Sequence, residues 1–237
     1  MHRRMFLIGA GFTPFAAHAS VEPITPGGAI SGEERLSWEE FIALAQSDAQ
    51  RLVANRTLTG QDAYLHAIAQ HAARLGELPL VDPEDFGALE PSYSFDMLRY
   101  AAPFAVIFWR MAPGAVYPAH NHPSTNVCTV CTAGNAVVRN FHAAAAPPIT
   151  EREASFDVVE TGHDLLEPGV VNLVGESRNN IHWFEAGPQG ADGLDITTTH
   201  GAMQPFSFLR LGNGALEAPG VRRFSARWVG NDPREAL

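Results

Sequence analysis

The sequence predicts an all-β protein, an antiparallel sandwich or barrel, that carries an N-terminal arm of two α-helices. After Pro79, short apolar runs such as FAVIFWRM, NVCTVCTA, VVNLV and FSFLRL alternate with Gly, Pro and Asn at spacings of roughly ten to fifteen residues. Before Pro79, the apolar residues recur at helical spacing instead. The 237 residues show no internal repeat and no long polar linker, so we expect a single domain over 20–237 with its β core at about 94–212.

Two amphipathic helices are predicted at about 37–76, ahead of the β core. Ser37 is followed three residues later by Glu40, which forms a capping box at the start of the first helix. Thr59 is the predicted N-cap of the second helix, and Gly76 ends that helix. Because each helix carries one apolar stripe, we expect the arm to pack against the β core.

Residues 1–19 have the layout of a secretory signal peptide. A basic start is followed by an apolar stretch and by a small-x-small ending at 17–19. The Arg3-Arg4 pair, followed by MFL, resembles the twin-arginine export signal, and an ordinary signal peptide is the alternative. The segment is too short and too interrupted by Gly and Pro for stable membrane insertion. We therefore expect a periplasmic or secreted protein.

The charge balance argues against nucleic acid as a partner. The chain has 26 acidic residues against 16 lysines and arginines. A phosphate backbone would on average be repelled by this surface.

Two histidines that stand one residue apart mark a candidate metal site. His120 and His122 follow a glycine in the spacing G-x5-H-x-H, and Gly134 stands twelve residues after His122. Residues two apart on a strand point to the same face, so both imidazoles can face one ion. This is the spacing of the first motif of cupin barrels, in which a glutamate usually follows three or four residues later. Asn126 and Val127 stand there instead, so the carboxylate ligand is missing.

A third histidine is expected on a later strand of the same barrel. His182, in ESRNNIHWFEAG, lies sixty residues beyond His122 and follows the predicted strand GVVNLVG and a turn. Three neutral imidazoles would leave open positions on the ion and its 2+ charge uncompensated. Such a site favours an anionic ligand, a thiolate above all, with dioxygen beside it.

At these residues the chain resembles the cysteamine dioxygenase and plant cysteine oxidase family of thiol dioxygenases, within the cupin superfamily. The family motifs read close to His-Asp-His-Pro, then Gly, and Gly-Asn-Ile-His-x-Phe; this chain has HNHP at 120–123 and NNIHWF at 179–184. The resemblance covers about 104–199. It implies a cupin fold (a double-stranded β-helix, or jelly-roll-like barrel), Fe(II) held by the three histidines, and oxidation of a small thiol such as cysteamine or cysteine to its sulfinate with O2.

Other functions remain open at this point. The same three histidines could hold Zn, Mn or Ni, and they could serve another metal-dependent cupin enzyme such as a ring-cleaving dioxygenase or an isomerase. A non-enzymatic periplasmic ligand-binding cupin is a further alternative, as is a cupin that has lost its metal. The sequence leaves the oligomeric state open.

Two further residues are candidates for supporting the metal ligands. The family has an aspartate in a strand about eleven residues after its second motif, and Asp195 in GLDITTT matches it. The family strand then continues into Pro-Pro-Tyr, whereas this chain has Thr198, Thr199 and His200. Asp195 and His200 are therefore candidates for contact with the ligands or the substrate, and no catalytic residue is predicted beyond the metal ligands.

Arginines on predicted strands are candidates for holding a substrate carboxylate. Arg110 and Arg139 could do so with a bidentate guanidinium if they point inward, and the alternative is that they face solvent. Arg99 with Tyr100 is a weaker candidate. The expected apolar walls of the pocket are the residues Ile107, Phe108, Val127 and Trp183.

The C-x-x-C pair at Cys128 and Cys131 is not expected to bind metal or form a disulfide. If Val127 faces inward, strand alternation places Cys131 inward and Cys128 outward. Two cysteines an odd number of residues apart on one strand cannot readily meet. We expect two small buried side chains, and no thioether crosslink at Val127.

Overall fold

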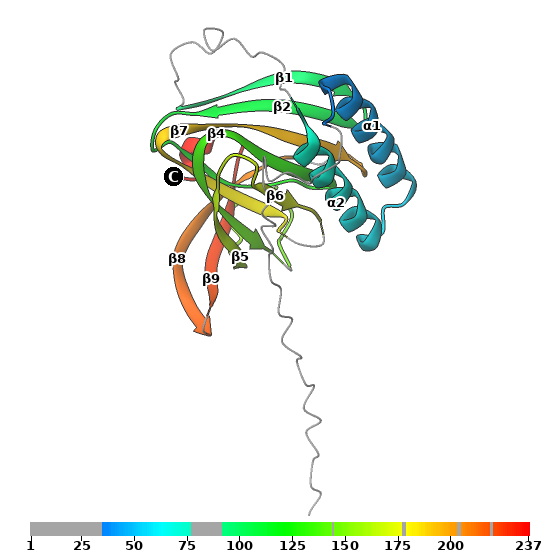
Figure 1. Cartoon of the computed structure of the whole chain (residues 1–237). Coiled ribbons are helices and arrows are strands. Elements are labelled where there is room, and N and C mark those ends of the chain that lie inside the picture. The colour runs from blue at the N-terminus through cyan, green and yellow to red at the C-terminus, as the bar shows by residue number, and fades with distance from the viewer. Residues whose placement is uncertain (1–34, 77–91, 144, 177–178, 203–204, 219) are drawn as a thin grey trace, which may run out of the picture.

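The computed structural model describes residues 35–76, 92–143, 145–176, 179–202, 205–218 and 220–237 (Figure 1). The predicted signal peptide lies outside these residues. Neither described helix combines the length and the apolar character that a membrane span needs.

The arm consists of α1 (Trp38–Ala54) and α2 (Leu58–Arg74). The predicted capping box is confirmed, because the Ser37 side chain accepts from the Glu40 amide while the Glu40 carboxylate accepts from the Ser37 amide. The predicted N-cap of α2 at Thr59 is wrong. Thr57 caps this helix instead, and its Oγ1 accepts from the Gly60 amide at 3.1 Å. Two threonines at this position make the choice of cap ambiguous in the sequence alone.

Nine strands follow the arm in the part of the chain that the structure describes, so the all-β class is confirmed. They are β1 Tyr93–Ala101, β2 Phe104–Met111, β3 Val116–Asn121, β4 Thr125–His142, β5 Phe156–Leu166, β6 Val171–Val174, β7 Ile181–Thr199, β8 Phe208–Ala218 and β9 Val221–Gly230.

The β core runs to Gly230, beyond the predicted end at 212. The segment VRRFSARWVG forms β9 and pairs with both β8 and β5. Phe224, Ala226 and Trp228 are buried in it while their neighbours are largely exposed. This period-two pattern is a strand signal that three arginines obscure.

The long strands β4 and β7 organise the barrel. They pair with one another antiparallel along most of their length, and the register shifts on both sides of Gly134. The arm-side layer contains β1, β2, the second half of β7, the first half of β4, and β6. The far layer contains β3, the first half of β7, the second half of β4, β5, β9 and β8. Two layers that share the same bent strands make a double-stranded β-helix, as predicted.

Three apolar clusters fill this architecture. The helices pack on the outer face of the arm-side layer, against Phe104, Val106 and Phe108 of β2 (Figure 1). A second cluster lies between the layers and includes Trp109 and Phe184. The third cluster lies on the opposite face of the far layer from the second cluster, and every strand of the far layer contributes to it. Side chains between the two layers therefore face the interior in which the metal site is expected.

Candidate metal centre

The three predicted histidines converge between the layers. The Nε2 atom of His182 lies 2.8 Å from that of His120 and 2.9 Å from that of His122. Their ligand atoms all lie within 4.8 Å of one another. This is the only group of three or more potential metal ligands within the described ranges.

Strand pairing places the three imidazoles. His120 on β3 lies directly opposite His182 on β7, so both side chains occupy the same face. A register shift between Tyr117 and His120 interrupts the β3–β7 ladder just before the first ligand. His122 follows the end of β3, and its amide donates to the Asn180 carbonyl at 3.3 Å. The two motifs of the sequence thus meet through one strand pair.

The Nδ1 atoms of two histidines form hydrogen bonds on the side of the ring away from the cluster. His120 Nδ1 lies 2.8 Å from the Pro118 carbonyl, and His182 Nδ1 lies 3.3 Å from Asn172 Oδ1. Both partners are acceptors, so each Nδ1 carries the proton and each Nε2 keeps its lone pair for a ligand contact.

The electrostatics of the cluster suit a cation. Burial lowers the pKa of His122 to about 4 and lowers the pKa values of His120 and His182 well below their usual range. The neighbouring imidazoles add to the shift at His120 and His182. All three rings are therefore neutral at pH 7 and available as ligands, so the residues fit a divalent transition metal.

The metal-free protein is expected to lose stability on acidification. The unfolded chain protonates these histidines near pH 6.5 and the folded chain does not, so the unfolded state binds more protons below that pH. The free energy of unfolding should therefore fall between about pH 6.5 and about pH 4. Asp195, whose folded pKa is raised to about 6, and Asp164, whose pKa burial also raises, oppose this trend. Burial lowers the pKa values of His71, His142 and His200 as well, and these three groups add to the trend. Thermal unfolding of chelator-treated protein across this range checks the prediction, and a flat profile would contradict it.

The absent carboxylate ligand is not replaced at its usual position. Val127 is fully buried there, and Asn126 turns to the arm, where its Nδ2 donates to the Gln61 carbonyl at 3.3 Å. The described residues therefore offer a three-histidine set.

A small cavity with aromatic walls, of about 20 Å³, lies beside His120 and has room for one small group. Its other lining residues are Phe95, Trp109, Met111, Tyr117, Phe184 and Asp195. The Tyr117 ring packs edge-on against the His120 ring, and the Phe184 ring packs edge-on against the His182 ring. The ring centroids are 4.6 Å apart in each pair. Phe206 and Phe208 contact the His120 ring as well. These rings keep water away from the imidazoles on several sides.

Asp195 is the one charged side chain on the wall of this cavity. It stands opposite Thr129 on β4, whose Oγ1 donates to Asp195 Oδ1 at 2.6 Å. Burial raises the pKa of Asp195 to about 6 although this hydrogen bond lowers it. The group is thus an anion above about pH 6, close to the metal ligands.

His200 does not line the cavity beside His120. Its amide donates to the Ser124 carbonyl, and its charged neighbours are Glu176 and Arg56 at the junction with the arm. The side chain is buried and its Nε2 has no hydrogen-bond partner. The structure does not place it on the wall of the cavity beside His120.

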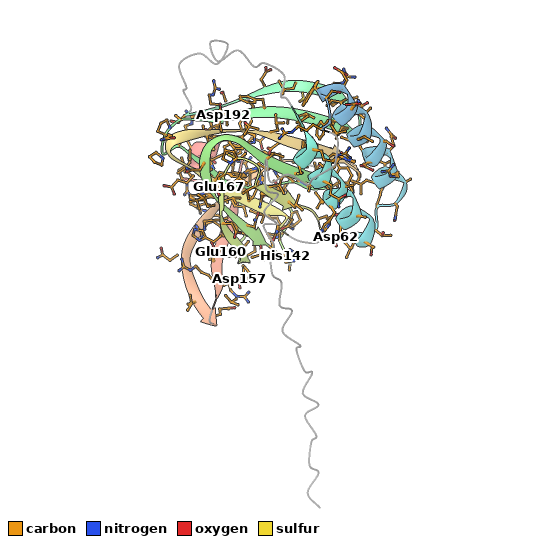
Figure 2. The ribbon with its side chains drawn as sticks, in the orientation of Figure 1. Asp62, His142, Asp157, Glu160, Glu167 and Asp192 are labelled. Atoms are coloured by element: carbon orange, nitrogen blue, oxygen red, sulfur yellow. The ribbon has the colours of Figure 1, made fainter. Side chains whose placement is uncertain are left out.

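Both candidate arginines are engaged in ion pairs. Arg110 makes a bidentate pair with Asp192, with distances of 2.8 and 2.6 Å. Arg139 donates to Glu160 at 2.7 Å and lies over aromatic rings behind the far layer. The two carboxylates occupy separate places in the molecule (Figure 2). Neither arginine lines the cavity beside His120.

Two of the residues expected on the pocket wall, Phe108 and Trp183, point away from the interior. Phe108 packs against the helices, and Trp183 packs behind the far layer, because each lies on the face of its strand that points away from the interior. Ile107 lies directly opposite Asp195 and shares its face, but neither Ile107 nor Val127 lines the cavity beside His120. Val127 is buried at the position where a cupin carboxylate would stand.

The cysteine prediction is confirmed. Cys128 packs in the cluster under the helices and Cys131 in the cluster between the layers. Both are free and buried.

Sequence reasoning missed Asn172 and Tyr117. Asn172 is a single polar residue in the otherwise apolar strand VNLV, and a buried amide in such a run needs a partner. That signal was present in the sequence. Tyr117 carries no comparable signal, because its contact with His120 depends on the register shift in β3.

No model of a known protein family and no curated protein sequence matches the chain. Similar solved structures include KdgF from Halomonas sp., with 14% identity over 54% of this chain and 97% of that chain and a TM-score of 0.38. A conserved protein with a double-stranded beta-helix domain from Klebsiella pneumoniae shows 13% identity over 56% of this chain and 97% of that one, with a TM-score of 0.38. Pumpkin pro-11S globulin shows 11% identity over 56% of this chain and 30% of that one, with a TM-score of 0.37. These distant likenesses concern the fold.

Proposed function

We propose that the chain is a non-heme Fe(II) thiol dioxygenase, which converts a small thiol and O2 to the sulfinic acid (RSH + O2 → RSO2H). Both oxygen atoms end on sulfur, so the reaction needs no external reductant. The observation that carries the proposal is the set of three neutral imidazoles with no carboxylate at the fourth position.

His120, His122 and His182 would hold the iron through their Nε2 atoms. Iron(II) bound there supplies the activation of dioxygen that organic side chains cannot provide. The three histidines add no negative charge, so the site attracts an anionic thiolate. The aromatic rings around His120 exclude water from the reacting groups.

The cavity favours thiols that carry an amine. Asp195 is its single charged lining residue, and no arginine or lysine stands on its wall. The aromatic residues Phe95, Trp109 and Tyr117 also line the cavity, and the face of an aromatic ring attracts a cation. An ammonium group therefore finds an oppositely charged partner on this wall, whereas a carboxylate does not.

The test combines elemental analysis with aerobic turnover. Iron-loaded protein is incubated with cysteamine, cysteine and 3-mercaptopropionate, and oxygen uptake is measured together with sulfinate. We expect one sulfinate for each O2 consumed. Absence of uptake with every thiol would overturn the proposal. Zinc, manganese or nickel in the purified protein would point to another cupin enzyme, and ligand binding without turnover would point to a binding protein.

Replacing Asp195 by asparagine should change the thiol preference. The amide keeps the shape but removes the anion, so the ratio of kcat/KM for cysteamine to that for 3-mercaptopropionate should fall about tenfold. The same ratio in wild type should fall as the pH drops below about 6, where Asp195 becomes protonated. Asp192→Asn, which removes a carboxylate outside the cavity, is the matched control. An unchanged ratio in Asp195→Asn would show that this carboxylate does not select the substrate.

Export is a separate proposal that rests on residues 1–19 of the sequence. A periplasmic or secreted location would bring the enzyme into contact with extracytoplasmic thiols.

A further inference from the structure

The edge strand β1 carries a row of exposed apolar side chains on its inner face. Phe95, Met97 and Tyr100 are 46%, 51% and 69% exposed, and we call these three residues the β1 strip. They lie opposite Trp109, Ile107 and Ala105 of β2. These β2 residues lie on the face of the strand that points to the interior between the layers, because the residues that alternate with them pack against the helices.

A β-bulge keeps the strip on one face. The register shifts between Met97 and Arg99, so Tyr100 pairs with Ala105 rather than with a residue of the outer face. Without the extra residue, strand alternation would turn Tyr100 toward the helices. The partly buried Leu98 points to the helix cluster instead. The local irregularity thus adds a third apolar side chain to the inner face.

The strip is continuous with the cavity beside His120. Phe95 belongs to both, because it lines the cavity together with His120 and Asp195, and its ring contacts Tyr117 at 5.2 Å. From Phe95 the strip runs along β1 for about 15 Å to Tyr100. Ile107 adds apolar surface beside Met97, and the nearest charges on β1, Asp96 and Arg99, lie on the other face.

We propose that the β1 strip binds an extended apolar substituent of the substrate, so that the preferred ligand is a thiol with an amine near the sulfur and an apolar tail. This inference rests on the proposed function and narrows its substrate class. The ammonium group enters the small cavity beside His120 and Asp195, and the tail lies along Phe95, Met97 and Tyr100. Burial of the tail removes apolar surface of both partners from water.

The expected gain in binding affinity can be stated for each methylene of the tail. Full burial of a CH2 group is worth about fourfold in affinity, and a strip that covers one side of a chain should give about twofold. Affinity should therefore rise about twofold for each methylene added to a straight chain, until the chain passes Tyr100.

The experiment uses two homologous series with the metal-loaded protein. n-Alkylamines from ethyl to octyl and n-alkanethiols of the same lengths are titrated calorimetrically without oxygen. In Met97→Glu, the gain per methylene should disappear, because a carboxylate on the strip must be desolvated by the tail. Tyr100→Glu gives the same test at the end of the strip and serves if Met97→Glu does not fold. Leu216→Glu is the matched control, because Leu216 is 68% exposed on the distant β8 and β9 hairpin.

Each outcome decides the inference. A gain per methylene that Met97→Glu or Tyr100→Glu abolishes and Leu216→Glu retains supports it. The inference is overturned if affinity rises equally per methylene in wild type and in both strip variants. It is also overturned if affinity in wild type does not change with chain length. A change of oligomeric state in Met97→Glu with an unchanged series would make the strip a contact between copies of the chain, and also overturns it. If no thiol is oxidised while the alkylamine series shows the gain, the proposed function fails and the strip still binds apolar chains.

Discussion

His182→Ala should abolish metal binding while the fold is retained. The side chain is fully buried, and its Nε2 lies within 3 Å of the Nε2 atoms of the other two histidines. Two imidazoles without a carboxylate make a weak site, and loss of an outer partner alone typically lowers metal affinity 10–100-fold, so loss of a ligand should exceed about hundredfold. Metal content after loading and desalting, with far-UV circular dichroism, measures both parts of the prediction.

The matched control is His163→Ala. His163 is exposed on β5 and contacts Glu160, so its removal deletes an imidazole without touching the cluster. It should bind metal as wild type does. Metal content in His182→Ala equal to wild type would show that the three histidines are satisfied by one another and hold no ion.

The candidate metal ligands could be predicted from the sequence because their placement depends on local geometry. His120 and His122 stand two residues apart where β3 ends, and the second motif places His182 on the partner strand β7. His122 lies just beyond the strand, where its amide bond to the Asn180 carbonyl continues the pairing. The outward turn of Cys128 followed from the same alternation.

The apolar pocket wall could not be predicted residue by residue, and none of the four expected apolar side chains lines the cavity beside His120. Phe108 and Trp183 are as apolar as Ile107, but each lies on the face that points away from the interior. Bulges in β1, β3 and β4 reset the alternation, and the sequence does not mark them. The ion pairs of Arg110 and Arg139 depend on strand partners far along the chain, which no local pattern reveals.

Gly134→Ala should be the most destabilising single substitution considered for the barrel. Gly134 has φ +66°, where a Cβ atom is strained, and the added Cβ would lie 2.1 Å from the Gly190 carbonyl oxygen. That oxygen belongs to the backbone of β7 at the point where the two long strands bend together, so it cannot move without breaking their pairing. We expect a loss of about 4 kcal/mol or more in the free energy of unfolding, from denaturant titration.

Gly114→Ala separates the two causes of this loss. Gly114 has nearly the same φ, +68°, but its added Cβ would meet nothing within 4 Å. It should lose only the backbone strain, about 1–2 kcal/mol. The difference between the two variants then measures the close approach of β4 to β7. Equal losses would mean that the strands can separate at the bend, and that the bent strands β4 and β7 do not rigidly fix the arm-side layer against the far layer, which carries the histidines.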